Sequence, residues 1–459
     1  MFIKMEENGK VFKPMSDVAP NSCPNGHPNQ PSAKFCGTCG KKIELDINAP
    51  SSIQTPSPTS GDPLATTKSP DFCFVGVGEV GIKLVGTLRE LVGSNMDNHA
   101  FLGFDSEFSS NFHKLRLPKQ NVYKIGTDSQ GTGHFWKMGE KLATESSPIK
   151  QILLDKGANH ARAVAMLFAL GGGMGSGGGP YLMSELSDWG IHGAKLALGV
   201  LPADDEPDQM HFNAYSGLAR LIRYRQKYNC DMIILLNNSN LDRYRTVDRS
   251  GRELTNNEVI ATICNMIATE GPAGTYTSIN INDLITFERS MKAFHFAPFL
   301  SMSHSTRIYG SLTGVLESAF ARPLMPFDRD TAVLSYLFLR ISDSLREKMT
   351  YADLLSEYDA WRQQRLPANR VSYFGLSYTS DEMDKMDAML LVGGHLLAPT
   401  INRSHEGYSR MKESSTVTPD ELDVIDDIHR GYDHDLRTLY QRVQEGTGTS
   451  TGKPRQHKK

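Results

Sequence analysis

Four residues near the N-terminus have the types and the spacing of a metal site. Cys36 and Cys39 are separated by two residues and followed by a glycine, so that a tight turn can point both thiolates at one ion. With Cys23 and His27 they make a set of three thiolates and one imidazole, the closed tetrahedral geometry of structural Zn²⁺. We therefore predict a zinc ribbon over 21–43 that is folded by its metal, because so short a segment cannot bury a core. A redox-active Cys-x-x-Cys is the alternative, but no βαβ pattern surrounds the pair.

Two clusters of glycines lie directly after apolar runs, which is where α/β proteins bind their ligands. The first, over 76–81, reads Gly-Val-Gly-Glu-Val-Gly, a pattern that alone indicates a dinucleotide fold only weakly. The second, over 171–179, reads Gly-Gly-Gly-Met-Gly-Ser-Gly-Gly-Gly and opens a helix that begins near Ser176. Successive backbone amides at such a helix N-terminus form a cradle for a polyphosphate. A Rossmann oxidoreductase has no use for the second loop, and a Walker P-loop is excluded because neither loop ends in Gly-Lys-Ser/Thr.

The glycine clusters need strands to hold them, and five short apolar runs have the composition of strands buried on both faces. These runs alternate with helical patterns and cover 72–77, 100–104, 163–170, 194–201 and 231–236. We therefore predict a parallel α/β sheet over 71–290. A smaller α+β domain is expected over 291–405, with a long helix from Asp330 to about Arg346 and strand-like runs at 294–302, 371–378 and 388–393.

Composition limits what else the chain can be. Its 459 residues carry 49 Lys and Arg against 52 Asp and Glu, a formal charge of −3, which excludes binding of nucleic acid by bulk positive charge. No run approaches the roughly 18 apolar residues of a membrane span, and the N-terminus lacks the apolar core of a signal peptide. Cys73, Cys230 and Cys264 lie in apolar contexts and are expected to be buried free thiols, which favours the reducing cytoplasm.

The two ends of the chain have little apolar patterning. Residues 1–20 are expected to be disordered, and 44–70 to form a flexible linker, because 14 of the 21 residues from Pro50 to Pro70 are Pro, Ser or Thr. Residues 406–459 are expected to form a polar helical segment and a basic tail. The four cations of that tail would bind nucleic acid or an anionic membrane only weakly.

The second glycine cluster resembles GGGTGSG, the signature loop of the tubulin/FtsZ superfamily, with Met174 in the place of its threonine. Other motifs follow in the order of that family. Residues 72–81 resemble its first nucleotide loop, 101–105 (Phe-Leu-Gly-Phe-Asp) the second, and Gly131-x-Gly133-x5-Gly139 the third, which senses the γ-phosphate.

The resemblance continues through the second part of the chain. Pro202-x3-Glu206 is similar to the ribose loop of FtsZ, and 231–238 to the strand that ends in the guanine-binding asparagine. Asn257-Glu-Val-Ile resembles the start of the central helix, and 294–301 the tubulin strand that enters the second domain. Over about 71–400 the chain is thus identified as a divergent member of the tubulin/FtsZ superfamily, of prokaryotic or viral type.

The resemblance implies a site for GTP and GDP with Mg²⁺ bound beside the nucleotide. Backbone amides of 171–177 would hold the α- and β-phosphates, and Glu206 would accept hydrogen bonds from the ribose. The side-chain amides of Asn238 and Asn257 can distinguish guanine from adenine, with Asn237 as an alternative for Asn238. The nucleotide-binding residues implied are Gly76, Gly78, Glu79, Gly81, Asp105, Gly131, Thr132, Gly133, Gly171, Gly172, Gly173, Met174, Gly175, Ser176, Gly177, Glu206, Asn238 and Asn257.

Hydrolysis in this family needs acidic residues from a neighbouring subunit, which position the attacking water. Asp283 lies at the first acidic position, and Glu288 is the acid nearest to the second position, where this chain has Thr286. Three further departures replace a phosphate-contacting threonine, a phosphate-proximal arginine and a base-stacking aromatic; they are Met174, Met210 and Glu253. These departures favour nucleotide binding over turnover.

Two functions follow from the resemblance. The first is a GTP-binding, self-assembling cytoskeletal protein that forms head-to-tail filaments and hydrolyses GTP in sites completed by the neighbouring subunit. The alternative is a non-polymerising nucleotide-binding adaptor with degenerate catalysis, whose zinc ribbon recruits a protein partner. The complete set of nucleotide loops favours the first, and the altered catalytic loop favours the second.

Overall fold

The computed structural model describes residues 70–93, 98–107, 115–126, 131–226, 230–269, 279, 295–380, 383–394 and 398–413, all within one compact unit, Thr67–Lys459. The predicted ribbon, the predicted linker as far as residue 69 and the tail from residue 414 lie outside the described residues. So do the predicted zinc ligands Cys23, His27, Cys36 and Cys39 and the predicted catalytic acids Asp283 and Glu288.

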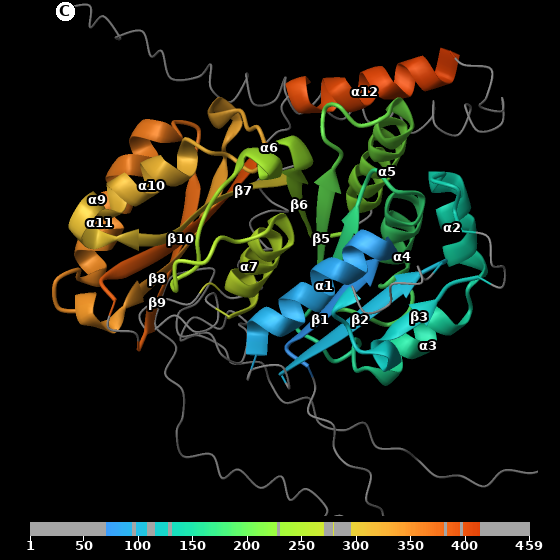
Figure 1. Cartoon of the computed structure of the whole chain (residues 1–459), viewed down its shortest axis with the longest axis horizontal. Coiled ribbons are helices and arrows are strands. Elements are labelled where there is room, and N and C mark those ends of the chain that lie inside the picture. The colour runs from blue at the N-terminus through green and yellow to red at the C-terminus, as the bar shows by residue number, and fades with distance from the viewer. Residues whose placement is uncertain are drawn as a thin grey trace, which may run out of the picture. The chain divides into compact units, whose positions relative to one another are not determined.

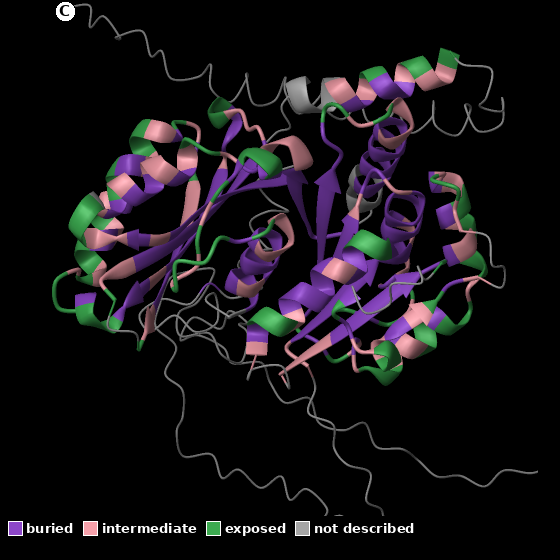
Figure 2. Ribbon diagram, viewed as in Figure 1, coloured by how far each residue is buried: buried purple, intermediate pink, exposed green. Residues whose placement is uncertain are grey.

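Ten strands of the described chain form one sheet in the order β3-β2-β1-β4-β5-β6-β7-β10-β8-β9 (Figure 1). The first six strands along the chain pair in parallel, as predicted. They are β1 (Phe72–Val77), β2 (His99–Asp105), β3 (Val122–Lys124), β4 (Ala163–Ala169), β5 (Ala194–Leu201) and β6 (Met232–Asn237). Every residue of β1, β5 and β6 is buried, and these strands form the purple centre of Figure 2. The prediction of strands buried on both faces is therefore confirmed.

Helices cover both faces of the sheet and close two hydrophobic cores, each of which continues from β1 to β10. One core packs against α1 (Gly78–Val92) and α7 (Asn256–Thr269). The other packs against α2 (Trp136–Glu145), α3 (Pro148–Asp155), α4 (Gly179–Glu185), α5 (Asp208–Gln226), α10 (Leu312–Phe320) and α11 (Tyr351–Arg365). No helix in the described part of the chain has both the length and the apolar character of a membrane span.

The three cysteines of the described chain are free and buried, as predicted. Cys73 and Cys230 belong to one core and Cys264 to the other. Burial raises the pKa of the Cys73 and Cys264 thiols to about 12, so these thiols stay protonated and unreactive at neutral pH.

The second half of the sheet comes from residues beyond 294. Strand β7 (His295–Ser305) pairs in parallel with β6, and β10 (Lys385–Gly394) lies antiparallel between β7 and β8 (Leu334–Ser342). Strand β9 (Val371–Thr379) forms the edge, parallel to β8. The shorter elements and the last helix are η3 (Lys119–Asn121), the π-helical η4 (Met174–Gly178), α6 (Asn238–Arg243), α9 (Thr306–Tyr309), η5 (Arg329–Thr331), η6 (Asp343–Leu345) and α12 (Ala398–Glu413).

The prediction of a long helix from Asp330 to about Arg346 is wrong, because 334–342 form strand β8. This strand pairs with β10 on one side and β9 on the other, and both of its faces are covered. Leu337 and Leu339 enter one core while Tyr336 and Phe338 enter the other. A strand buried on both faces is apolar at odd and even positions, so its sequence also satisfies the i, i+3, i+4 spacing of a helix.

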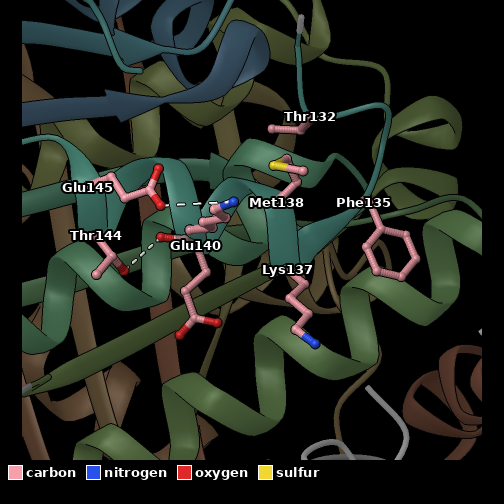
Figure 3. A pocket seen from close by; sticks show the side chains of 8 residues that line it. Thr132, Phe135, Lys137, Met138, Glu140, Thr144 and Glu145 are labelled. Carbon is pink, nitrogen blue, oxygen red and sulfur yellow. Dashed lines mark hydrogen bonds and ion pairs between the residues drawn. The ribbon is translucent and has the colours of Figure 1, made fainter. Parts of the chain in front are cut away.

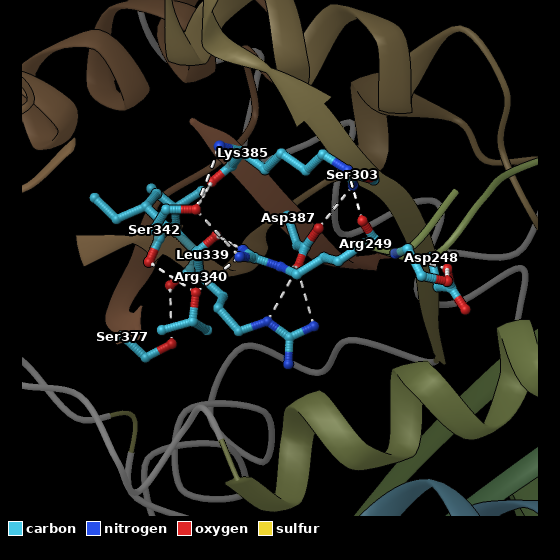
Figure 4. Close-up of polar contacts among 12 residues, drawn as sticks. Asp248, Arg249, Ser303, Leu339, Arg340, Ser342, Ser377, Lys385 and Asp387 are labelled. Atoms are coloured by element: carbon cyan, nitrogen blue, oxygen red, sulfur yellow. Dashed lines mark hydrogen bonds and ion pairs between the residues drawn. The ribbon is translucent and has the colours of Figure 1, made fainter. Parts of the chain in front are cut away.

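A buried carboxylate ties the loop between α6 and α7 to the second half of the sheet (Figure 4). Asp387 of β10 is fully buried; its Oδ2 accepts from Nε of Arg249 at 2.7 Å and from Arg340 of β8 at 2.9 Å. The backbone N–H of Ser303 in β7 donates to the other Asp387 oxygen at 2.7 Å. Arg249, which belongs to the α6–α7 loop, also donates to Thr379 of β9 at 2.7 Å. One carboxylate thus joins this loop to β7, β8 and β10.

Candidate nucleotide-binding site

The first glycine loop connects β1 directly to α1. A side chain on Gly76 would collide with the backbone of Gly81, so the turn closes only because both positions lack one. Gly78 has φ +76°, a conformation that favours glycine, and a Cβ there would lie 3.3 Å from the backbone nitrogen of Gly175. The first loop and the second glycine cluster are therefore in direct contact. Glu79 points outward and pairs with Lys83 one turn along α1.

The signature segment 171–177 turns its two side chains inward. Met174 is 4% exposed and packs in the core, where its Cε lies against Gly178. Ser176 is fully buried and its hydroxyl donates to the carbonyl of Gly172. Gly172 is half-buried, and a Cβ on it would meet nothing within 4 Å. The open surface of the segment is therefore the backbone around Gly172, next to the start of a helix, where backbone amides can bind anions.

The third loop, 131–135, lies on the signature segment. A Cβ on Gly173 would lie 2.5 Å from the hydroxyl of Thr132 and 2.7 Å from the backbone nitrogen of Phe135. Gly133 and His134 both have φ +58°, and these left-handed conformations let the chain reverse into α2. Behind the loop, the backbones of Gly139 in α2 and Gly177 come so close to those of Gly173 and Trp136 that neither position has room for a side chain.

A buried asparagine that the sequence analysis missed joins these two loops. Asn213 of α5 is fully buried; its Nδ2 donates to the carbonyl of His134 at 2.7 Å and to that of Gly171 at 2.9 Å. Its Oδ1 accepts from the backbone N–H of Trp136 at 3.2 Å. One side chain thus fixes the third loop against the signature segment. The signal in the sequence is a polar residue among the apolar positions of a helix, between Phe212 and the next alanine.

Two acidic residues, Asp105 at the end of β2 and Glu107 after it, lie at the same edge of the sheet. Asp105 is 8% exposed and accepts the backbone N–H of Ser106 at 2.8 Å. Burial raises the pKa of its carboxyl to about 6, and the nearby charges of Glu79 and Glu107 add to the effect. Glu107 in turn lies against Gly131 of the third loop. A buried carboxylate without a cation is suited to accept one, and carboxylate oxygens are ligands that Mg²⁺ prefers.

The ribose loop, 202–206, precedes α5. Glu206 folds back, and its Oε2 accepts the backbone N–H of Ala203 at 2.6 Å. Burial raises the pKa of the Glu206 carboxyl. The backbone N–H of Asp204 donates to Ser239 of α6 at 2.8 Å, so this loop is attached to the segment that contains Asn238. Met210 of α5 lies against Gly171, where the FtsZ pattern has an arginine.

The asparagines at the ends of β6 and the start of α7 have different roles. Asn237 is buried and caps α6, where its Oδ1 accepts the backbone N–H of Asn240 at 3.2 Å. Asn238 and Asn257 are half-buried, and among the described residues their side chains make no hydrogen bond. Asn256, the neighbour of Asn257, donates to Asp242 at 2.6 Å. The amides of Asn238 and Asn257 are therefore available to a base, whereas that of Asn237 is used in the fold.

Glu253, at the position of the base-stacking aromatic, is exposed and pairs with Arg245 at 3.4 Å. No group of three or more His, Cys, Asp or Glu side chains that could hold a metal ion occurs in the described parts of the chain. A pocket of about 620 Å³ lies beside the third loop and α2 (Figure 3), but it takes only Thr132 from the predicted site. It is lined by Thr132, Phe135, Lys137, Met138, Glu140, Lys141, Thr144 and Glu145.

The loops that follow β1, β2, β4, β5 and β6 thus meet at the carboxyl edge of a parallel sheet, where α/β folds bind ligands. No family model matches the sequence. Over 212 residues the chain is 27% identical to the tubulin-like protein CetZ2 of Haloferax volcanii. The matched region covers 44% of this chain and 54% of that relative. The chain spans about half the length of this curated relative.

Solved structures match more of the chain. CetZ1 of Haloferax volcanii, solved as a GDP-bound monomer, superposes with a TM-score of 0.61 at 18% identity, over 75% of this chain and all of CetZ1. The chain has a tubulin/FtsZ fold. The GTPγS-bound protofilament of CetZ2 from the same organism has a TM-score of 0.58 at 17% identity, over 74% of this chain and 99% of CetZ2. In this tubulin/FtsZ fold, the glycine clusters and Asp105 lie on consecutive loops of one sheet edge.

Proposed function

We propose that this protein binds GTP and GDP with Mg²⁺ in the site formed by the five loops. The observation that carries the proposal is the signature segment, whose side chains are buried and whose open surface is backbone around Gly172. A chain of amides at a helix N-terminus favours phosphate groups. Met174 does not weaken this cradle, because its side chain is buried in the core.

Guanine is the base that the remaining polar groups suit. Asn238 and Asn257 each offer a donor and an acceptor, and guanine presents both kinds of group on the edge that an amide can pair. Asp105 supplies the charge for a metal beside the phosphates, since burial makes its ionised form unfavourable without a cation. The buried free thiols fit a reducing cytoplasm, which we propose as the location.

Binding of a fluorescent GTP analogue, with GTP and ATP as competitors, tests the base assignment. Asn257→Ala is expected to reduce the preference for GTP over ATP about tenfold, the effect of losing one well-made hydrogen bond pair. Asn256→Ala is the matched control, because its side chain is already bonded to Asp242 and lies one residue away. An equal effect of both variants, or no GTP binding by the parent, refutes the assignment.

We further propose that the protein assembles head to tail and that Asp283 and Glu288 of one subunit complete the GTPase site of the next. The support is the fold, together with a CetZ2 of the same fold that was solved as a protofilament. A head-to-tail interface that does not close produces filaments. No observation in the described residues favours the non-polymerising adaptor.

Sedimentation at increasing protein concentration with GTP, GDP and GTPγS tests assembly, and the absence of GTP-dependent pelleting refutes it.

A mixing experiment tests whether one subunit completes the GTPase site of the next. Asp283→Ala retains its own nucleotide pocket, and a pocket variant such as Gly172→Asp retains its own acidic loop. Each alone is expected to be inactive, whereas an equal mixture regains turnover at about one interface in four by random mixing. A mixture as inactive as its components refutes the shared site.

The structural Zn²⁺ bound by Cys23, His27, Cys36 and Cys39 stays a prediction, as does recruitment of a protein partner by the ribbon. Measuring zinc in the full-length protein by elemental analysis tests the metal: one equivalent is expected, and Cys36→Ser is expected to lose it. A full-length protein purified without chelator that holds no zinc refutes the ribbon.

A further inference from the structure

The last described helix, α12, packs along α5 beside the ribose loop (Figure 1). Tyr408 of α12 stacks on Phe212 of α5 with ring centroids 5.6 Å apart, and its ring lies 5.0 Å from that of Tyr215. Gly407 lies against the side chain of His211, where a larger residue would collide. These contacts hold α12 to the helix that begins directly after the ribose loop.

One arginine of α12 reaches past α5 to the loop itself. Nε of Arg403 donates to the carbonyl oxygen of Asp204 at 2.9 Å, and one of its terminal nitrogens donates to that of Glu206 at 3.4 Å. The same guanidinium pairs with Asp208, the first residue of α5, at 3.2 Å. The guanidinium of an arginine presents five donors in a fixed planar fork, whereas a lysine has three donors on a single nitrogen and cannot span acceptors that lie far apart. Arg403 therefore spans the ribose loop from its middle to its end.

A second arginine of α12 helps to distinguish docking of the helix on α5 from restraint of the ribose loop. Arg410 donates to both oxygens of Asp208, at 2.7 and 2.8 Å, and no contact of Arg410 with the ribose loop is seen in the described chain. Docking of α12 on α5 thus already has a bidentate ion pair and an aromatic stack. The bonds from Arg403 to two loop carbonyls come in addition to that docking, and they restrain the backbone on both sides of residue 205.

The loop has other restraints of its own. The backbone N–H of Ala203 donates to the Glu206 carboxylate, the N–H of Glu206 donates to the carbonyl of Ala203 at 3.1 Å, and the N–H of Asp204 donates to Ser239. None of these bonds uses the carbonyl oxygens of Asp204 and Glu206, to which Arg403 donates. Asp204 and Asp205 are exposed, and the loop carries three carboxylates within three residues, which repel one another. Arg403 bonds to backbone carbonyls on both sides of residue 205, so its removal should leave the backbone beside Glu206 less restrained.

We propose that Arg403 is a positioning residue for recognition of the nucleotide sugar, acting through the ribose loop from a helix almost 200 residues further along the chain. The inference rests on the proposed binding of GTP by this site. It assigns to α12 a role beyond packing: the helix sets the shape of the loop that reads the 2′-hydroxyl. The bonds of Arg403 go to the ribose loop and to Asp208, so its loss should alter sugar discrimination more than binding of the rest of the nucleotide.

The test compares the affinities of full-length protein for GTP and for 2′-deoxy-GTP. We expect the parent to prefer GTP, and Arg403→Gln to reduce that preference about tenfold, the size expected for one hydrogen bond to a charged group. Glu206→Gln should reduce it to a similar level, and the double variant should reduce it no further, because both changes act on one contact. Arg403→Lys should recover little. Arg410→Gln, which removes an ion pair from the same helix, should leave the preference unchanged.

A second measurement needs no nucleotide. Hydrogen exchange of the backbone amides of 203–206 is expected to become faster in Arg403→Gln and to stay at the parent rate in Arg410→Gln. Unchanged exchange in Arg403→Gln overturns the inference. So does an equal loss of GTP and 2′-deoxy-GTP affinity in that variant, which a merely structural role would produce. If the parent binds neither nucleotide, the proposed function fails, and the exchange experiment still decides whether Arg403 holds the loop.

Discussion

Replacing Asp105 by asparagine should stabilise the protein, and more so at pH 8 than at pH 5. The carboxyl of Asp105 is 8% exposed and its pKa is raised from 3.8 to about 6, mainly by burial. A carboxyl whose pKa is higher in the folded state holds its proton more tightly there, so its ionisation lowers stability as the pH rises from 3.8 past 6. Asparagine keeps the acceptor for the Ser106 N–H but carries no charge.

The magnitude follows from the two pKa values. At pH 8 the ionised carboxyl costs about 3 kcal/mol of folding free energy, since each tenfold difference in proton affinity is worth about 1.4 kcal/mol. At pH 5 the folded protein is mostly protonated and the unfolded chain mostly ionised, and the cost is about 1.6 kcal/mol. Asp105→Asn should therefore gain up to about 3 kcal/mol at pH 8 and roughly half of that at pH 5.

Urea unfolding of parent and variant, with chelator and without nucleotide, measures both values. Asp208→Asn is the control of opposite sign. Its partners Arg410 and Arg403 lower the pKa of the Asp208 carboxyl to about 2, so that its stabilising effect is complete above 3.8 and is lost only as the pH falls toward 2. Asp208→Asn should thus destabilise equally at pH 5 and pH 8. A pH-independent effect of Asp105→Asn would refute the reasoning, and Mg²⁺ with GTP should remove the variant's advantage.

Substitutions at three other positions separate packing from ligand binding. Gly172→Ala should fold with a melting temperature near that of the parent, because a Cβ there meets nothing within 4 Å, yet bind GTP more weakly in a titration. Met174→Ala should cost about 2–5 kcal/mol in urea unfolding, as other buried methionines do, and Met174→Thr, which restores the family residue, should not raise GTP turnover because position 174 faces the core. Asp387→Asn should cost about 3–5 kcal/mol, since it leaves Arg249 and Arg340 without their buried counter-ion; a loss below 1 kcal/mol in the same assay would show that the cluster is solvated.

The parts of the fold that the sequence predicted well are those in which one physical signal dominates. Runs such as 72–77 and 232–236 have no polar side chain, are short and are followed by glycine or asparagine, which favours a buried strand. The run 334–342 includes two serines and an arginine and is followed by Asp343, and its spacing also fits a helix. Only its pairing with β10 and β9, which depends on residues 30 or more positions away, decides between the two.

The parts of the candidate site that are formed by backbone were easier to predict from the sequence than the parts formed by side chains. The glycines of 171–177 identify the cradle because their spacing reflects the turn itself. Asn213 was missed because its partners are carbonyls 42 and 79 residues away, which no local pattern reveals. The sequence also left Asn237 and Asn238 as alternatives; in the structure Asn237 caps α6, whereas the side chain of Asn238 makes no hydrogen bond among the described residues, which favours Asn238 as the predicted ligand of the base.

Both hydrophobic cores run the whole width of the sheet, and this limits how the chain can be divided. Each core contains residues from β1 and from β10, so the apolar surface of one half of the sheet continues into the other. A fragment that stops before β7 would keep every nucleotide loop but would leave the edge of β6 and part of the apolar surface facing β7 open to water. We therefore expect that the half of the sheet with the predicted nucleotide site would not fold stably as a separate fragment.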